Sequence, residues 1–167
     1  MHLVRDPLSH PRGRAQLRIV GLGNGWRSDD AAGLAVARRL AGTVPGADVY
    51  EHEGEPTSLI DTWEDAERLW LVDAVSSNAP PGTVHRLDLT SSELPASFRR
   101  RSTHHVSLAE TVELARAIGR LPRLTVFFGI QGASFETGES LSPEVEAAVE
   151  HTAQVIREEV AACTRPR

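Results

Sequence analysis

Short apolar runs alternate along most of the chain with segments whose apolar residues recur at helical spacing. The runs typical of strands cover residues 15–22, 48–53, 68–75, 83–89 and 123–130. Segments with helical spacing lie at residues 30–40, 57–63, 108–118 and from 143 onward. Strands that alternate with helices predict an α/β domain with a largely parallel sheet covered on both faces.

Two of these runs differ in a way that predicts their places in the sheet. Residues 68–75 are almost continuously apolar, as a central parallel strand buried on both faces requires. Residues 83–89 alternate polar and apolar side chains and follow the turn 78–82, which indicates an antiparallel edge strand. We therefore expect a three-layer sandwich of about five mostly parallel strands with helices on both faces and one antiparallel edge strand.

Capping residues mark the starts of two helices. Ser107 is followed three residues later by Glu110, which is the sequence of a capping box. Ser142 is the expected N-cap of the last helix, with Pro143 at its first position.

The composition narrows the class of protein. The length of 167 residues fits one domain, and we expect it to span residues 15–163 behind a flexible N-terminal extension, residues 1–14. A net charge of −5 argues against nucleic-acid binding. All 18 basic residues are arginine, which excludes lysine-based covalent chemistry, and the single Cys163 permits no internal disulfide. With neither a membrane-length apolar run nor a secretion signal, we expect a cytoplasmic protein.

Residues 21–33 form a glycine-rich stretch between the first predicted strand and the first predicted helix. The chain has no lysine for a Walker loop, and Trp26 stands where the dinucleotide fingerprint needs glycine. Asp29 and Asp30 lie where the helix begins, so they occupy the position that a phosphate would use. Either aspartate is a candidate helix cap, and fixed carboxylates at the end of a strand also favour a cation. Gly33 is unfavourable inside a helix by about 1 kcal/mol, which suggests that another backbone passes close by.

Three segments place polar side chains where ligands bind in such sheets, beyond the carboxyl ends of the strands. Asn24, Asp29 and Asp30 follow the first strand, Asp73 interrupts the apolar run 68–75, and the segment 102–105, with His104 and His105, precedes the helix 108–118. Two carboxylates and one histidine are a plausible ligand set for a divalent cation such as Ni²⁺ or Zn²⁺. Each group also has a structural alternative: Asp29 or Asp30 as a helix cap, Asp73 bonded to nearby backbone, and the histidines of the loop exposed to solvent.

The sequence lacks the motifs of several other classes of enzyme. The chain contains no Gly-x-Ser-x-Gly elbow of an α/β-hydrolase and no Cys-x-x-Cys pair. His52 is not followed by the second histidine of a zincin helix. The Arg99–Arg101 run is interpreted as a solvated loop.

The order and spacing of short motifs resemble those of the nickel–iron hydrogenase maturation proteases. These are small endopeptidases that trim the C-terminal extension of the hydrogenase large-subunit precursor. The matching motifs, in chain order, are Gly21-Leu-Gly-Asn24, Asp29-Asp30 with Gly33, Val72-Asp-Ala-Val75, Pro81-Gly-Thr83, Ser102-x-His104, Leu108-Ala-Glu110, Gly129-Ile-Gln131 and Leu141-Ser-Pro143. They span about residues 16–160, nearly the whole chain.

The resemblance implies a function and a role for three residues. Asp30, Asp73 and His104 match the family's metal-contacting positions, which leaves Asp29 as the expected cap of the helix. Asp30 and Asp73 are the candidate catalytic carboxylates of a peptidase conventionally classed as aspartic-type. The nickel is expected to arrive with the precursor, so we expect no tightly bound metal in the protease itself. The implied partner is the large-subunit precursor, and we expect a monomer that binds neither nucleic acid nor membrane.

This sequence departs from the family pattern at several positions. Asp30 is shorter than the glutamate of many members, and Ala31 and Gly132 stand where glycine and proline are frequent. Residues 53–57 replace the commoner Asp-Gly-Gly-Thr pattern. Two rival functions remain: a non-catalytic nickel-sensing accessory protein, and a metal-dependent hydrolase of small peptides.

Overall fold

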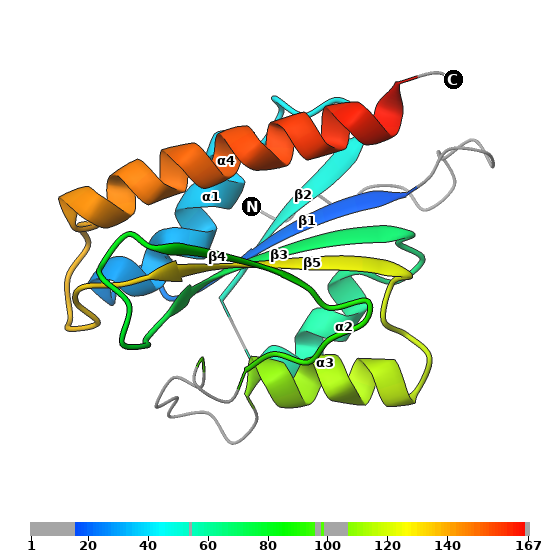
Figure 1. Ribbon diagram of the computed structural model, residues 1–167, viewed down its shortest axis with the longest axis horizontal. Coiled ribbons are helices and arrows are strands. Elements are labelled where there is room, and N and C mark those ends of the chain that lie inside the picture. The colour runs from blue at the N-terminus through cyan, green and yellow to red at the C-terminus, as the bar shows by residue number, and fades with distance from the viewer. Residues whose placement is uncertain (1–15, 54, 96–97, 99–106, 166–167) are drawn as a thin grey trace.

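The computed structural model describes residues 16–165 except 54, 96–97 and 99–106. Its centre is a five-stranded sheet with the strand order β2-β1-β3-β5-β4 (Figure 1). The strands are β1 (Leu17–Leu22), β2 (Ala47–His52), β3 (Arg68–Val75), β4 (Val84–Asp88) and β5 (Leu124–Gln131). Strands β2, β1, β3 and β5 pair in parallel, and β4 pairs antiparallel with β5 at the edge. The predicted mixed sheet and its antiparallel edge strand are confirmed.

Helices cover both faces of the sheet, as the alternation of strands and helices predicted. Figure 1 shows α1 (Ala32–Leu40) and α4 (Pro143–Thr164) on one face, with α2 (Leu59–Thr62) and α3 (Leu108–Ala117) on the other. Two short 3₁₀ helices, η1 (Ser28–Ala31) and η2 (Pro56–Ser58), precede α1 and α2. No helix in the described part of the chain is long and apolar enough to cross a membrane.

The sheet divides the buried side chains into two cores. Because successive side chains of a strand point to opposite faces, Phe127 and Phe128 of β5 enter different cores. Phe128 lies in the core beneath α1 and α4, together with Ile156. Phe127 lies in the core beneath α2 and α3, together with Val112. These opposed cores explain why β3 and β5 are apolar along nearly their whole length.

Helix α1 lies very close to the sheet because its second residue, Gly33, has no side chain. A Cβ atom added to Gly33 would lie 2.2 Å from the carbonyl oxygen of Leu22 and 2.3 Å from that of Val72. On the facing strand, a Cβ on Gly21 would lie 2.0 Å from the carbonyl oxygen of Gly33. The predicted close backbone at Gly33 is therefore confirmed, and it brings the start of α1 against both β1 and β3.

The capping predictions are confirmed at α3 and only partly at α4. Ser107 and Glu110 form both hydrogen bonds of the capping box. Ser142 is the N-cap residue of α4 and Pro143 lies in its first turn, but the Ser142 side chain makes no capping hydrogen bond. Its hydroxyl donates instead to Asp29, in the turn that follows β1.

Candidate active site

Asp30 and Asp73 come from neighbouring elements at the carboxyl ends of β1 and β3. In the parallel register Gly21 lies opposite Val72, so Asp73 is level with the end of β1. Asp30 lies on η1, the 3₁₀ helix that follows β1 and contacts β3. Asp30 and Asp73 are only 5% and 7% exposed, respectively. The structure thus buries two of the three predicted site residues at the expected edge of the sheet.

Burial changes the acid–base behaviour of Asp73. Its removal from water raises the pKa of the carboxyl group from 3.8 to about 8, against a smaller opposing effect of the Ala74 N–H. That N–H donates to Asp73 Oδ1 at 2.8 Å, so the alternative in which Asp73 bonds nearby backbone is also observed. A carboxyl group with this pKa holds its proton near neutral pH, and an approaching cation favours the ionised form.

Asp29 has a different role from the predicted one. The N-cap of η1 is Arg27, the N-cap of α1 is Ala31, and neither helix start has a side-chain capping hydrogen bond. The Asp29 carboxylate instead accepts from the backbone N–H groups of Ala133 and Ser134, at 2.8 and 3.0 Å. It also accepts from the backbone and hydroxyl of Ser142, at 2.7 and 2.9 Å. The prediction that Asp29 caps the helix is wrong, because its partners lie more than 100 residues away in the sequence.

These hydrogen bonds are part of a larger contact between two segments. We call residues 23–31 the site turn and residues 132–142 the facing segment. The backbone N–H of Ser28 donates to the carbonyl oxygen of Gly138 at 2.8 Å, and that of Asp29 donates to the carbonyl of Ser134 at 3.1 Å. Arg27 Nε also donates to the carbonyl of Phe135 at 3.2 Å. The facing segment therefore fixes the turn that carries Asp30.

The electrostatics of Asp29 follow from these contacts. Burial of Asp29 raises the pKa of its carboxyl group, but the hydrogen bonds from Ser142, Ser134 and Ala133 together outweigh it and hold the pKa below 3.8. Asp29 is therefore an ionised carboxylate whose acceptor sites are used within the protein. Among the adjacent aspartates, Asp30 remains the candidate for contact with a cation.

The third predicted ligand, His104, lies outside the described residues, as does the Arg99–Arg101 run. Within the part of the chain that the structure describes, no group of three His, Cys, Asp or Glu side chains is placed to hold a metal ion. Asp30 and Asp73 together offer carboxylate oxygens, so a cation at this edge needs further ligands from His104 or from the substrate.

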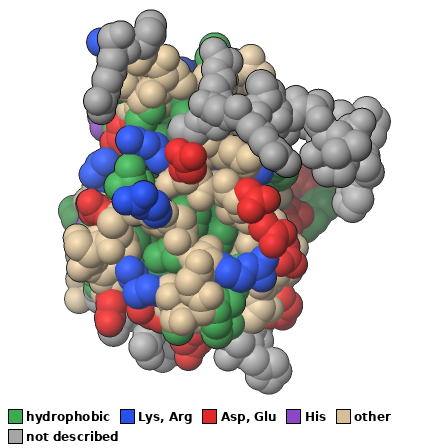
Figure 2. Space-filling view, turned by 90° about the vertical axis from the view of Figure 1, so that its right-hand side faces the viewer, with side chains coloured by type: hydrophobic (Ala, Val, Ile, Leu, Met, Phe, Trp, Pro, Cys, Tyr) green, Lys and Arg blue, Asp and Glu red, His purple; other side chains and the backbone are tan. Residues whose placement is uncertain are grey.

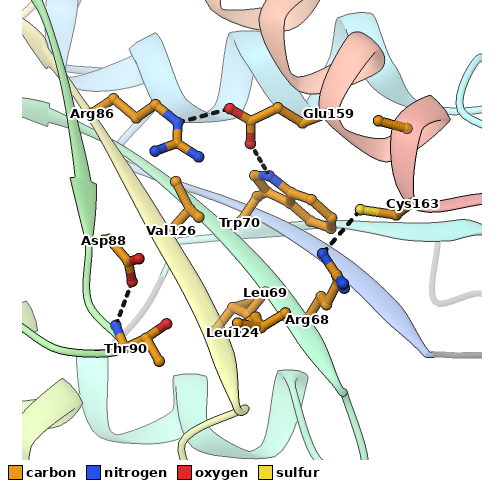
Figure 3. Close-up of a pocket in the computed structure, with 11 residues that line it drawn as sticks. Arg68, Leu69, Trp70, Arg86, Asp88, Thr90, Leu124, Val126, Glu159 and Cys163 are labelled. Atoms are coloured by element: carbon orange, nitrogen blue, oxygen red, sulfur yellow. Dashed lines mark hydrogen bonds and ion pairs between the residues drawn. The ribbon is translucent and has the colours of Figure 1, made fainter.

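A pocket of about 330 Å³ lies at the opposite edge of the sheet, between the starts of β3 and β5 and the last turns of α4 (Figure 3). Glu159 accepts hydrogen bonds from Trp70 Nε1 and Arg86 Nε, both at 2.7 Å, and Arg68 donates to Cys163 Sγ at 3.1 Å. Figure 2 shows this side of the molecule, where hydrophobic side chains lie between arginine and acidic ones. Neither Asp30 nor Asp73 lines this pocket.

Comparison with known proteins finds relatives among the hydrogenase maturation proteins. The model of the family HycI, hydrogenase maturation protease, matches residues 49–159, a range that includes Asp73. Hydrogenase 2 maturation protease of Escherichia coli is 29% identical over 140 residues, covering 81% of this chain and 84% of the relative. Hydrogenase expression/formation protein HupD of Thiocapsa roseopersicina is 27% identical over 157 residues, covering 86% and 70%.

Solved structures agree with this result. The [NiFe] hydrogenase maturation protease HybD from Thermococcus kodakarensis has a TM-score of 0.72 at 29% identity, covering 87% of this chain and 99% of that one. The hydrogenase maturating endopeptidase HybD from E. coli has the same fold, with a TM-score of 0.74 at 21% identity over 89% and 94% of the chains. Because the family model matches about two thirds of this chain, the chain belongs to the hydrogenase maturation protease family.

Proposed function

We propose that this protein is an endopeptidase that removes the C-terminal extension of a nickel–iron hydrogenase large-subunit precursor after recognising the inserted nickel. Membership of the maturation protease family supports an endopeptidase role in hydrogenase maturation. The observation that carries the finer proposal is the pair of buried carboxyl groups, Asp30 and Asp73, at one edge of the sheet. His104 is proposed as the third contact to the nickel.

The nickel belongs to the substrate in this proposal. Asp30 and Asp73 contact the ion in the precursor, and the contact holds the scissile peptide bond within reach of a water molecule. Fixing the reacting groups in this way converts an intermolecular hydrolysis into a positioned one. The protein needs no tightly bound metal of its own, and the precursor without nickel lacks the group that Asp30 and Asp73 recognise.

Peptide hydrolysis also requires proton transfer. One of the two carboxylates, Asp30 or Asp73, accepts a proton from the attacking water as its oxygen bonds to the scissile carbonyl carbon. The carbon–nitrogen bond then breaks as the protonated carboxyl group gives this proton to the leaving amine. Asp73 can serve in this way only when ionised, a form that nearby nickel favours over the protonated form set by burial.

The residues are tested by substitution with nickel-loaded precursor as substrate. Asp30→Ala and His104→Ala are each expected to slow cleavage by about 100-fold or more, since each removes a nickel contact or a proton-transfer group. Asp61→Ala is the matched control, because its carboxylate is 77% exposed and lies on α2. Precursor length is followed by intact-mass spectrometry, and the fold of each variant by circular dichroism.

The outcomes separate this proposal from its rivals. Wild-type rates for both Asp30→Ala and His104→Ala would refute the assignment of the site. A wild-type protein that binds nickel-loaded precursor without shortening it would be an accessory protein. Stoichiometric metal in the purified protein, with turnover of small peptides, would instead indicate a metal-dependent peptidase.

A further inference from the structure

Trp26 is the most exposed large hydrophobic side chain among the described residues. It is 67% exposed, whereas the other two tryptophans, Trp63 and Trp70, are 1% and 3% exposed. An exposed tryptophan carries a large apolar surface that contributes nothing to the protein's own core. Tryptophan is also enriched among the residues that dominate the energetics of protein interfaces.

The main chain at Trp26 is held in place even though its side chain is exposed. The Trp26 N–H donates to Asn24 Oδ1 at 2.9 Å, and its carbonyl oxygen accepts from the Gly138 N–H at 3.0 Å. The next residue but one, Ser28, has a φ of 48°, a left-handed conformation that is uncommon for serine. Ser28 is fixed there by hydrogen bonds from its N–H to Gly138 and from its hydroxyl to Glu136, at 2.8 and 3.0 Å.

Trp26 belongs to the same hydrogen-bonded turn as the candidate catalytic residue Asp30. The Asp30 N–H donates to the carbonyl oxygen of Arg27 at 3.0 Å, and the Asn24 N–H donates to the carbonyl oxygen of Asp30 at 3.3 Å. Trp26 thus lies between two residues whose backbones contact that of Asp30. One short turn therefore carries both the exposed indole and the candidate catalytic carboxyl group.

We propose that Trp26 is a docking contact for an apolar side chain of the precursor segment that carries the scissile bond. The inference rests on the proposed function and adds the residue that holds the peptide. The partner is a polypeptide, because the position of Trp26 in the site turn is continuous with the edge to which the proposed substrate binds. Its contacting side chain is apolar, because the indole offers surface that is lost from water on contact.

The fixed main chain makes this contact efficient. Binding loses free energy when flexible loops and side chains have to be ordered, and the hydrogen bonds of the site turn have already ordered the backbone. Tryptophan adds a large area with few rotatable bonds. Truncation of a tryptophan that anchors an interface typically weakens binding by about 30-fold.

Steady-state cleavage of nickel-loaded precursor tests the contact. Trp26→Ala is expected to raise KM by about 30-fold and to leave kcat within about twofold, because the interaction is made in the bound substrate as well as in the transition state. Trp26→Leu and Trp26→Phe keep an apolar side chain and are expected to restore most of the loss. Ile118→Ala, a truncation of a 52% exposed side chain at the end of α3, is the control and is expected to leave both constants unchanged.

Three kinetic results would overturn the proposal: an unchanged KM in Trp26→Ala, a loss confined to kcat, or a Trp26→Leu variant as poor as Trp26→Ala. The last result would mean that the partner recognises the aromatic ring itself, as a cation does, instead of its apolar surface. Cleavage by the wild type in the same assay supports the proposed function whatever the variants do.

A binding measurement separates failure of docking from failure of catalysis. The protein is labelled with 5-hydroxytryptophan, whose fluorescence is excited at a wavelength that the ordinary tryptophans of the precursor do not absorb. Acrylamide quenching of this fluorescence reports mainly on Trp26, since Trp63 and Trp70 are buried. Nickel-loaded precursor is expected to reduce the quenching of the wild type and to leave labelled Trp26→Phe unchanged. Undiminished quenching at saturating precursor would refute the docking contact even if the precursor is cut.

Discussion

Replacement of Asp29 tests whether its carboxylate fixes the site turn. Oδ2 accepts three hydrogen bonds, from Ala133, Ser134 and the hydroxyl of Ser142, and Oδ1 accepts one from the Ser142 backbone. Asp29→Ala removes all four and leaves three backbone N–H groups without this acceptor. Asp29→Asn cannot reproduce them, because either orientation of the amide turns its NH₂ group toward at least one backbone N–H.

The expected loss of stability follows from this difference. A buried N–H group left without an acceptor costs about 1–3 kcal/mol, and with three such groups we expect a loss of about 3–5 kcal/mol for Asp29→Ala. One mispaired donor costs about 1–3 kcal/mol, which we expect for Asp29→Asn. Ser142→Ala loses only the hydroxyl hydrogen bond and should cost about 1 kcal/mol. The exposed control Asp61→Asn should lie within about 0.5 kcal/mol of the wild type.

Urea unfolding measures these free energies, and acid supplies an independent check. The pKa of Asp29 is lower in the folded protein than its ordinary 3.8, so its stabilisation is complete above that value and is lost as pH falls through the folded pKa. The difference in stability between wild type and Asp29→Asn should therefore shrink below pH 3.8. If Asp29→Ala and Asp29→Asn have the same urea midpoint of unfolding as the wild type, the hydrogen bonds of Asp29 do not hold the facing segment in place.

Two further substitutions test other parts of the structure. Gly33→Ala should lower the free energy of unfolding in urea by about 1–3 kcal/mol, because the added Cβ would lie 2.2 Å from the carbonyl oxygen of Leu22. This loss is expected even though alanine has the higher helix propensity. A variant as stable as the wild type, or more stable, would contradict the close approach. Asp73→Asn should be more stable than the wild type by a few kcal/mol at pH 9, and should cleave precursor at least about 100-fold more slowly. The sign of the stability change follows from the pKa of about 8, since a raised carboxyl pKa makes the folded state less stable as pH rises from 3.8 toward 8. A wild type whose stability does not fall over that pH range relative to Asp73→Asn would show that Asp73 is not buried as described.

The sequence pattern predicted most strands and helices, because these elements depend mainly on residues that are close together in the chain. The bounds of β3, residues 68–75, coincide with the predicted strand, since a central strand needs a continuous apolar run between polar ends. The capping box of α3 is likewise contained within four consecutive residues. Gly33 in the sequence predicted that another backbone lies close to this helix, but not which one. The structure identifies the close backbones as those of β1 and β3.

The site turn could not be predicted in the same way, because distant residues determine it. Helix α1 begins at Ala32, two residues later than expected, since residues 28–31 form η1. The Asp29 N–H bonds the carbonyl oxygen of Ser134, and the Asp29 carboxylate bonds Ser142, which lies 113 residues away. An aspartate before a helix has the local sequence of a cap whether or not such partners exist. The grouping of Asp30 with Asp73 was predictable because it needs only the rule that the carboxyl ends of parallel strands meet at one edge.

The most direct test of the proposed function is the mass of the large-subunit precursor after incubation with this protein, with and without nickel in the precursor. Nickel-loaded precursor is expected to become shorter by one C-terminal fragment, while nickel-free precursor keeps its full mass. Equal cleavage of both forms would contradict nickel recognition by Asp30, Asp73 and His104. Full-length mass for both forms would contradict the proposed endopeptidase activity itself.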